Sequence, residues 1–156
     1  MPGKVLTLDQ VAALIKSKEI GVFAGADLSA IDLRVLDLMR ANLSSANLRG
    51  VDLSGTSLVM ANFIGASLCE ADLTGANLTD ATMWLADFTG ARLATANLTG
   101  AYLVGAKLGG ADLRGATLLD ANLWKADLRD AKLEGASLSG IILKGANLEG
   151  ASGLPY

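Results

Sequence analysis

Carboxylate side chains recur along this sequence at multiples of five residues, a spacing that could build an array for acid–base catalysis or cation binding. The eight members of the series are Asp27, Asp32, Asp37, Asp52, Asp72, Asp87, Asp112 and Asp127. Asn occupies the equivalent place seven times. A catalytic carboxylate is not freely exchanged for a neutral amide, whereas both residue types form turns by hydrogen bonding to nearby backbone. We therefore expect these residues to shape turns rather than to form a catalytic or metal site.

Nucleophilic and metal-binding side chains are scarce. The chain has one cysteine, Cys69, and no histidine. It therefore lacks the residues for a His-dependent triad, a mixed His/Cys zinc site or an internal disulfide. We expect Cys69 to point outward among polar side chains, exposed to solvent and without a base beside it. The sequence therefore predicts a protein that is not an enzyme and takes no metal or cofactor.

Composition and charge exclude further classes. The 156 residues, about one domain in length, carry 13 Lys and Arg against 16 Asp and Glu, a net charge of −3. This balance does not support a basic nucleic-acid-binding surface. Although 51% of the residues are hydrophobic, no apolar run approaches the ~18 residues of a membrane span, and Asp9 and Gln10 interrupt any secretory signal in residues 1–20. We therefore expect a cytoplasmic protein that binds neither membranes nor, directly, nucleic acid.

A five-residue repeat accounts for the apolar excess. Residues 26–150 divide into 25 consecutive pentapeptides without insertion or deletion. The first position is Ala in 20 of them, the second is Asp or Asn in 15, the third is Leu in 22 and the fifth is Gly in 13. Five residues match neither the helical period nor the strand period. We therefore expect the small and large apolar positions to point inward in a structure that turns corners regularly, with Gly providing the positive φ of tight turns.

These runs, for example residues 71–75 (ADLTG) and 76–80 (ANLTD), resemble the A(D/N)LXX motif of the pentapeptide-repeat protein family. The resemblance covers 125 of the 156 residues. It implies an all-β fold, a right-handed quadrilateral parallel β-helix (a solenoid) in which four pentapeptides make one coil. Coils stacked at about 4.8 Å would number about 6–7 and form a rod of roughly 30 Å.

The chain is expected to have three segments: an N-terminal segment with a short capping α-helix (1–20), the pentapeptide-repeat β-helix (21–150) and a C-terminal tail (151–156). Thr7 and Gln10 form a capping-box pattern before an amphipathic helix at residues 8–18. An open solenoid end exposes core side chains and free backbone hydrogen-bonding groups. The helix is therefore interpreted as a cap of that end, with a partner-binding or membrane-surface helix as the alternative.

The C-terminal tail breaks the repeat, since Gly153 replaces the central Leu and Pro155 cannot donate to a ladder. Leu154 and Tyr156 either fold over the last coil or contact a second molecule there. The family resemblance adds that some pentapeptide-repeat proteins pair through their C-terminal ends. We therefore hypothesise a homodimer with Leu154 and Tyr156 as the candidate C-terminal contact.

A coil of 20 residues sorts the pentapeptides into four faces, and one of them differs from the rest. We call it the tryptophan face, and it consists of residues 41–45, 61–65, 81–85, 101–105, 121–125 and 141–145. Its candidate interaction residues are Ile64, Trp84, Leu85, Tyr102, Val104, Trp124 and Ile142. Outward positions of the other three faces are polar or mixed. Two interpretations are open: these side chains stack to stabilise the ladder, or they form a protein-interaction patch anchored by the two tryptophans.

The leading hypothesis for function is a non-enzymatic scaffold, a rigid rod that presents the tryptophan face to a protein partner or to itself. The family resemblance implies an alternative, because some pentapeptide-repeat proteins mimic DNA and bind DNA gyrase or another type II topoisomerase. Such mimicry needs a strongly negative surface, whereas the net charge here is −3 and the outward acids are interleaved with Arg and Lys. A chiefly structural rod is the third possibility.

Overall fold

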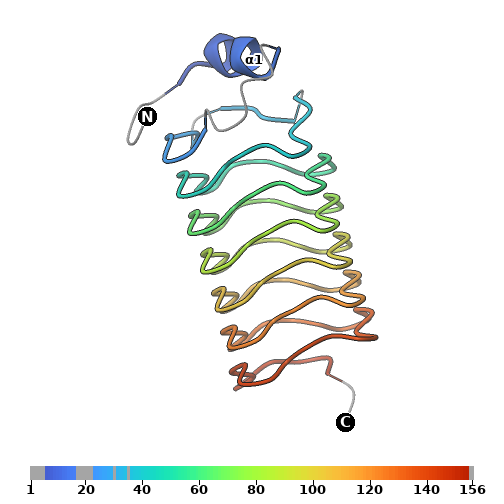
Figure 1. The fold of residues 1–156 in the computed structure, drawn as a ribbon. Coiled ribbons are helices and arrows are strands. Elements are labelled where there is room, and N and C mark those ends of the chain that lie inside the picture. The colour runs from blue at the N-terminus through green and yellow to red at the C-terminus, as the bar shows by residue number, and fades with distance from the viewer. Residues whose placement is uncertain (1–5, 17–22, 30, 35, 155–156) are drawn as a thin grey trace.

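From residue 41 on, the second residue of each pentapeptide forms a parallel bridge with a counterpart 20 residues away, as Asp72 does with Arg92. The computed structural model describes residues 6–16, 23–29, 31–34 and 36–154. Within these residues the pairing consists of isolated parallel bridges, each followed by a two-residue turn at the fourth and fifth positions of the repeat. Four pentapeptides therefore complete one coil, and the coils stack into the rod shown in Figure 1.

Backbone hydrogen bonds join each coil to the next in both directions. The Leu93 amide donates to the Asp112 carbonyl (2.7 Å), and the Thr95 amide donates to the Arg114 carbonyl (2.9 Å). In return, the Asp112 amide donates to the Ala91 carbonyl at 2.9 Å. This pattern repeats along the rod, so the buried backbone is satisfied by neighbouring coils rather than by water.

The first and third positions of the repeat build the core, as the sequence predicts. The Ala and Leu side chains at these positions are buried through the middle of the rod, and Phe63, Met83 and Phe88, which replace Leu, are each fully buried. The apolar excess of the sequence is therefore a single continuous core that runs along the rod axis.

The fifth position turns the corner in the left-handed region of backbone conformation. Glycine serves there at Gly75, with a φ of 67°. Among the described residues, ten other than glycine also take a positive φ, all of them at fifth positions, and Asp80 with a φ of 56° is one example. Side chains in this region are rare because they crowd the backbone. The coil geometry therefore overrides the local preference of these ten residues.

The two ends of the rod differ. Helix α1 (Leu8–Lys16) lies at the N-terminal end of the rod, next to the first coil, in Figure 1. It begins with a capping box: the Thr7 amide donates to Gln10 Oε1 (3.0 Å), and the Gln10 amide donates to Thr7 Oγ1 (3.3 Å). Val11 is fully buried, whereas Leu8 is exposed. At the C-terminal end, Leu143 and Leu148 are half-buried. Among the described residues, no helix has the length and apolarity needed to cross a lipid bilayer.

Candidate interaction face

The bridges place the six repeats of the tryptophan face directly above one another. Asn62 pairs with Thr82, Thr82 with Tyr102, and Tyr102 with Asn122, which in turn pairs with Ile142. Residues at the same position of these repeats are therefore one coil apart, about 4.8 Å. The structure brings all seven predicted side chains onto this one side of the rod.

Six of the seven candidate side chains are exposed. The exposed fraction is 69% for Leu85, 46% for Trp84 and 40% for Trp124. Ile64, Tyr102 and Ile142 are exposed as well, and Val104 between the two tryptophans is half-buried. The apolar groups of this face are therefore in contact with solvent even after the coils have stacked.

Side-chain amides fix three turns of the tryptophan face, at Asn42, Asn62 and Asn122. The amide of Trp124 donates to Asn122 Oδ1 at 3.0 Å, and the amide of Ile64 donates to Asn62 Oδ1 at 3.0 Å. The ammonium group of Lys125 lies 4.4 Å from the centroid of the Trp124 ring, within the range of a cation–π interaction. The Trp124 carbonyl also accepts a hydrogen bond from the Gly105 amide of the neighbouring coil at 2.9 Å. The Trp124 backbone is thus held on both sides before any partner binds.

The charges of this face are all positive. Its six repeats contain Lys125 and Lys144 and no Asp or Glu. The corner that precedes the face, formed by the fourth and fifth residues of the preceding repeats, carries the acidic Asp80 and Asp120 and, at its first coil, the basic Arg40. Acidic groups thus border the face on one side only.

The same corner holds apolar residues that were not among the sequence-based candidates. Met39 and Met60 are exposed there, and Val59 and Leu119 are half-buried. The signal that identifies them is the register itself, because the last two residues of one repeat form the border of the next face. The sequence register places Met60 and Leu119 on the side that adjoins the tryptophan face, and the stacked coils make that side its border.

The carboxylates and amides at the second position form turns, as the sequence predicts. All fifteen Asp and Asn residues there accept a hydrogen bond from the backbone amide two residues later. Asp112 Oδ1, for example, accepts from the Arg114 amide at 3.1 Å. Asp and Asn offer the same acceptor oxygen, which explains why they exchange freely.

Most of these aspartates also pair with a basic side chain. Ion pairs of 2.6 to 3.4 Å join arginine or lysine to six of them: Asp32, Asp52, Asp72, Asp87, Asp112 and Asp127. The Arg34 guanidinium, through its hydrogen bonds, lowers the pKa of Asp32 to about 2. Negative charge on these faces is therefore compensated locally and does not form a continuous array.

Cys69 is half-buried, which corrects the expectation that it is exposed. Burial raises the pKa of its thiol, and Ser67 Oγ lies 3.8 Å from its sulfur. Thr74 and Thr79, at the same repeat position, are half-buried as well. Within the described residues, no group of three His, Cys, Asp or Glu side chains lies close enough to hold a metal ion.

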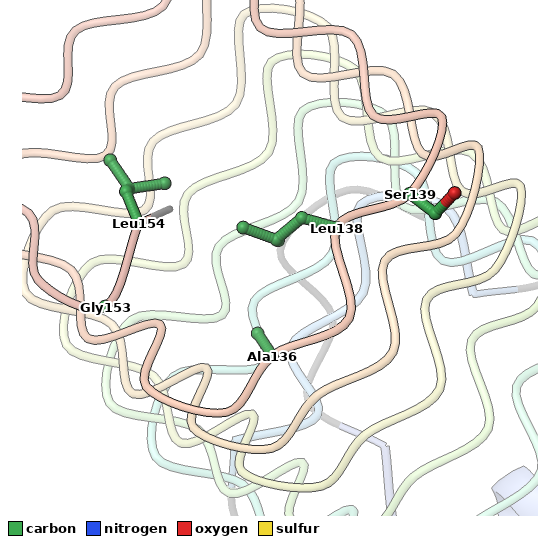
Figure 2. A pocket seen from close by; sticks show the side chains of 5 residues that line it. All are labelled: Ala136, Leu138, Ser139, Gly153 and Leu154. Carbon is green, nitrogen blue, oxygen red and sulfur yellow. The ribbon is translucent and has the colours of Figure 1, made fainter. Parts of the chain in front are cut away.

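The C-terminal end of the rod has an open apolar hollow of about 520 Å³. Figure 2 shows Ala136, Leu138 and Leu154 around it, together with Gly153 and Ser139. Within residues 36–154, the amides of Leu138, Leu143 and Leu148 donate no backbone hydrogen bond. Leu154 therefore lines the end of the core without closing it, and Tyr156 lies outside the described residues.

The repeat register also matches known proteins. The family described as pentapeptide repeats matches the chain in eight copies, over residues 22–55, 56–94, 96–135 and 131–152. The chain belongs to the pentapeptide-repeat family. Members of this family fold as right-handed quadrilateral β-helices, and the parallel 20-residue coil of this pentapeptide-repeat protein agrees with that architecture. The family assignment made from the A(D/N)LXX motif is thereby confirmed.

Solved structures of pentapeptide-repeat proteins resemble the chain. Rfr23 from the cyanobacterium Cyanothece 51142 is 36% identical over 55% of this chain and 58% of its own, with a TM-score of 0.55. HetL from Nostoc sp. PCC 7120, a protein involved in heterocyst differentiation regulation, is 39% identical over 85% of this chain and 71% of its own, with a TM-score of 0.42. QnrB1, a plasmid-mediated fluoroquinolone resistance protein, is 23% identical over 83% and 66%, with a TM-score of 0.53.

The likenesses to Rfr23 and QnrB1 support the fold and leave the partner open. The chain spans 58% of the length of the Rfr23 structure and 66% of that of QnrB1. Comparison with the curated protein sequences gives no significant match. Pentapeptide-repeat proteins are generally scaffolds without catalytic activity, and different surfaces on the same fold can bind different partners. The surface of this chain is therefore the evidence on which its function rests.

Proposed function

We propose that this pentapeptide-repeat protein is a non-enzymatic scaffold that binds a protein through the tryptophan face. One observation carries the proposal: the exposed apolar side chains of the β-helix gather on one of its four faces. Nine large hydrophobic side chains of the described residues are exposed, and one of them, Leu8, belongs to α1. Of the eight in the β-helix, six lie on the tryptophan face and the other two, Met39 and Met60, at its bordering corner.

Ladder packing alone is a weaker explanation of this concentration. On the other faces, the equivalent outward positions hold residues such as Thr74, Thr79 and Arg114, and the coils stack there with the same hydrogen bonds. The ladder therefore does not require tryptophan. Trp84 and Trp124 also keep 46% and 40% of their area exposed after stacking. Aromatic side chains of this kind supply much of the binding energy where proteins meet.

The fold suits such a role because it fixes the spacing of side chains in advance. Six to seven coils with α1 as a cap over the N-terminal end would form a rigid cytoplasmic rod. Little conformational entropy is lost when a partner binds a surface that is already ordered. The C-terminal end needs a cover of its own, because the unpaired amides and the hollow around Leu138 and Leu154 leave the last coil open.

Self-association is the second part of the proposal. A homodimer has two surfaces available: the tryptophan face, and the C-terminal end with Leu154 and Tyr156. The DNA-mimic alternative, with DNA gyrase as the partner, has less support. Six of the eight second-position aspartates are ion-paired within the chain, so much of the negative charge that mimicry needs is compensated locally.

The experiment is affinity capture from native lysate with the wild type, the double variant Trp84→Ala/Trp124→Ala and a control. The matched control is Arg114→Ala/Arg129→Ala, which removes two large side chains from the same repeat position on other faces. We expect a captured protein with the wild type and the control and its loss with the tryptophan variant, while circular dichroism shows all three folded. Equal capture by the two variants would contradict the proposal.

A further inference from the structure

We propose that the tryptophan face packs against the same face of a second copy of this chain, with the two rods parallel and related by a two-fold axis that runs along them. The inference rests on the proposed function and names its partner. A face-to-face contact of this kind is self-complementary, so every contact occurs twice. Its direction is fixed by what lies on the two corners that border the face.

Each coil contributes two corners to the tryptophan face. One corner precedes the face, at the fourth and fifth residues of the preceding repeat, and the other follows it, at the fourth and fifth residues of the face's own repeat. Coils stack in register along the rod (Figure 1), so both corners of one coil lie at nearly the same height. A two-fold axis along the rods sets the preceding corner of one copy opposite the following corner of the other, at the same coil.

This arrangement matches the charges. The exposed residues Asp120 and Lys125 stand at the preceding and the following corner of one coil, so their opposite charges would face each other twice across the interface. At the other coils, at most one of the two opposing corners is charged. An antiparallel arrangement that sets Trp84 opposite Trp124 would instead bring Asp120 opposite Asp80, and like charges that face each other are unfavourable.

Apolar side chains match in the same register. At one coil Val59 lies at the preceding corner and Ile64 at the following corner, so each would face the other in the second copy. Leu119 and Trp124 are placed in the same way at another coil. Tyr102 and Ile142 sit at the middle of the face and would meet their own copies near the axis. The two ammonium groups of each copy meet no like charge, because Lys144 stands opposite the uncharged corner at Ser139 and Gly140.

Charge reversal combined with sedimentation velocity tests the register. D120K and K125D should each weaken the dimer about tenfold or more, since either places like charges opposite each other twice. The double variant D120K/K125D should restore the wild-type dissociation constant. D130K is the control, because Asp130 is also a left-handed fifth-position residue, with a φ of 58° against 56° for Asp120, but lies on another face. Weakening by D130K equal to that of D120K, or no recovery in the double variant, would overturn the register.

Disulfide trapping tests the direction of the rods. In a C69S background, which removes the native thiol, I142C should cross-link to itself under mild oxidation because position 142 meets its own copy only when the rods are parallel. Cross-linking of I142C to N62C instead, in a mixture of the two variants, would show antiparallel rods. A dimer that forms without either cross-link would place the contact elsewhere, such as the C-terminal end, and would overturn the proposal.

The outcomes also separate this inference from the proposed function. A chain that stays monomeric at high micromolar concentration, yet captures a protein in a manner that depends on Trp84 and Trp124, would overturn the second copy as partner and keep the interaction face. A dimer unaffected by Trp84→Ala/Trp124→Ala would remove the tryptophan face from self-association altogether.

Discussion

The carboxylate of Asp80 lies over the backbone of Gly100, one coil further along the rod, so closely that a β-carbon on Gly100 would overlap it. Asp120 stands over Gly140 and Asp130 over Gly150 in the same way. Asp80 takes a left-handed conformation, which directs its side chain along the rod axis. A β-carbon on Gly100 therefore fits only if the Asp80 side chain moves aside.

Gly100→Ala should destabilise the protein by about 2 kcal/mol or more, from the left-handed backbone and from contact with Asp80. Gly110→Ala is the matched control, because Gly110 has the same φ of 66° but no neighbouring atom within 4 Å of its added carbon. It should lose only the backbone part, about 1 kcal/mol. Denaturant unfolding of both variants, and of Gly100→Ala combined with Asp80→Ala, measures the coupling. Equal losses for Gly100→Ala and Gly110→Ala would contradict this reasoning.

Truncation of the core should cost more in the middle of the rod than at its open end. Leu93 is fully buried, so Leu93→Ala should lower the free energy of unfolding by about 3 kcal/mol. Leu148 holds the same repeat position in the last coil, where it is half-buried. Leu148→Ala should cost about 1 kcal/mol, since less surface is lost from the core. Similar losses at both positions would mean that the C-terminal end is covered in solution.

Stability should be flat near neutral pH and fall in acid. The chain has no histidine, whereas hydrogen bonds from Arg34, Arg114 and Arg129 lower the pKa of Asp32, Asp112 and Asp127, that of Asp32 to about 2. A lowered pKa stabilises the fold above the unfolded value of about 4. This contribution is lost as the pH falls from there through the folded pKa. Thermal unfolding between pH 8 and 2 measures it.

Asp112→Asn is the variant that separates the ion pair from the turn. The substitution removes the titrating carboxyl group, while the amide oxygen of Asn still accepts a hydrogen bond from the Arg114 backbone amide. Its acid transition should therefore be shallower than that of the wild type. A transition between pH 5 and 8 in the wild type would contradict the assignment of the acid loss to these aspartates.

The protein should leave DNA gyrase unaffected. Its second-position carboxylates are largely paired with basic side chains, as Asp127 is with Arg129 at 2.7 Å. A surface of this kind offers little of the charge density of a DNA backbone. A supercoiling assay with micromolar protein should show neither inhibition nor protection of the enzyme. Inhibition under these conditions would favour the DNA-mimic alternative.

The repeat and its core can be predicted from the sequence, whereas the contacts between corner residues of adjacent coils cannot. Leu at the third position and Asp or Asn at the second predict their own environments, because each is repeated often enough to show what the coil requires of it. The overlap between Asp80 and Gly100 joins residues 20 apart and appears only once the coils are stacked. The half-burial of Cys69 is likewise not visible in the repeat motif, which specifies no residue type at the fourth position.

Tryptophan fluorescence tests the central claim most directly, because the chain has two tryptophans, Trp84 and Trp124, and both lie exposed on the proposed interaction face. Acrylamide quenching should be strong in dilute protein and should fall as the protein concentration, or the concentration of a captured partner, is raised. The midpoint of that change should coincide with association measured by sedimentation. Association that proceeds while quenching stays unchanged would show that the tryptophan face remains open to solvent and would contradict the account.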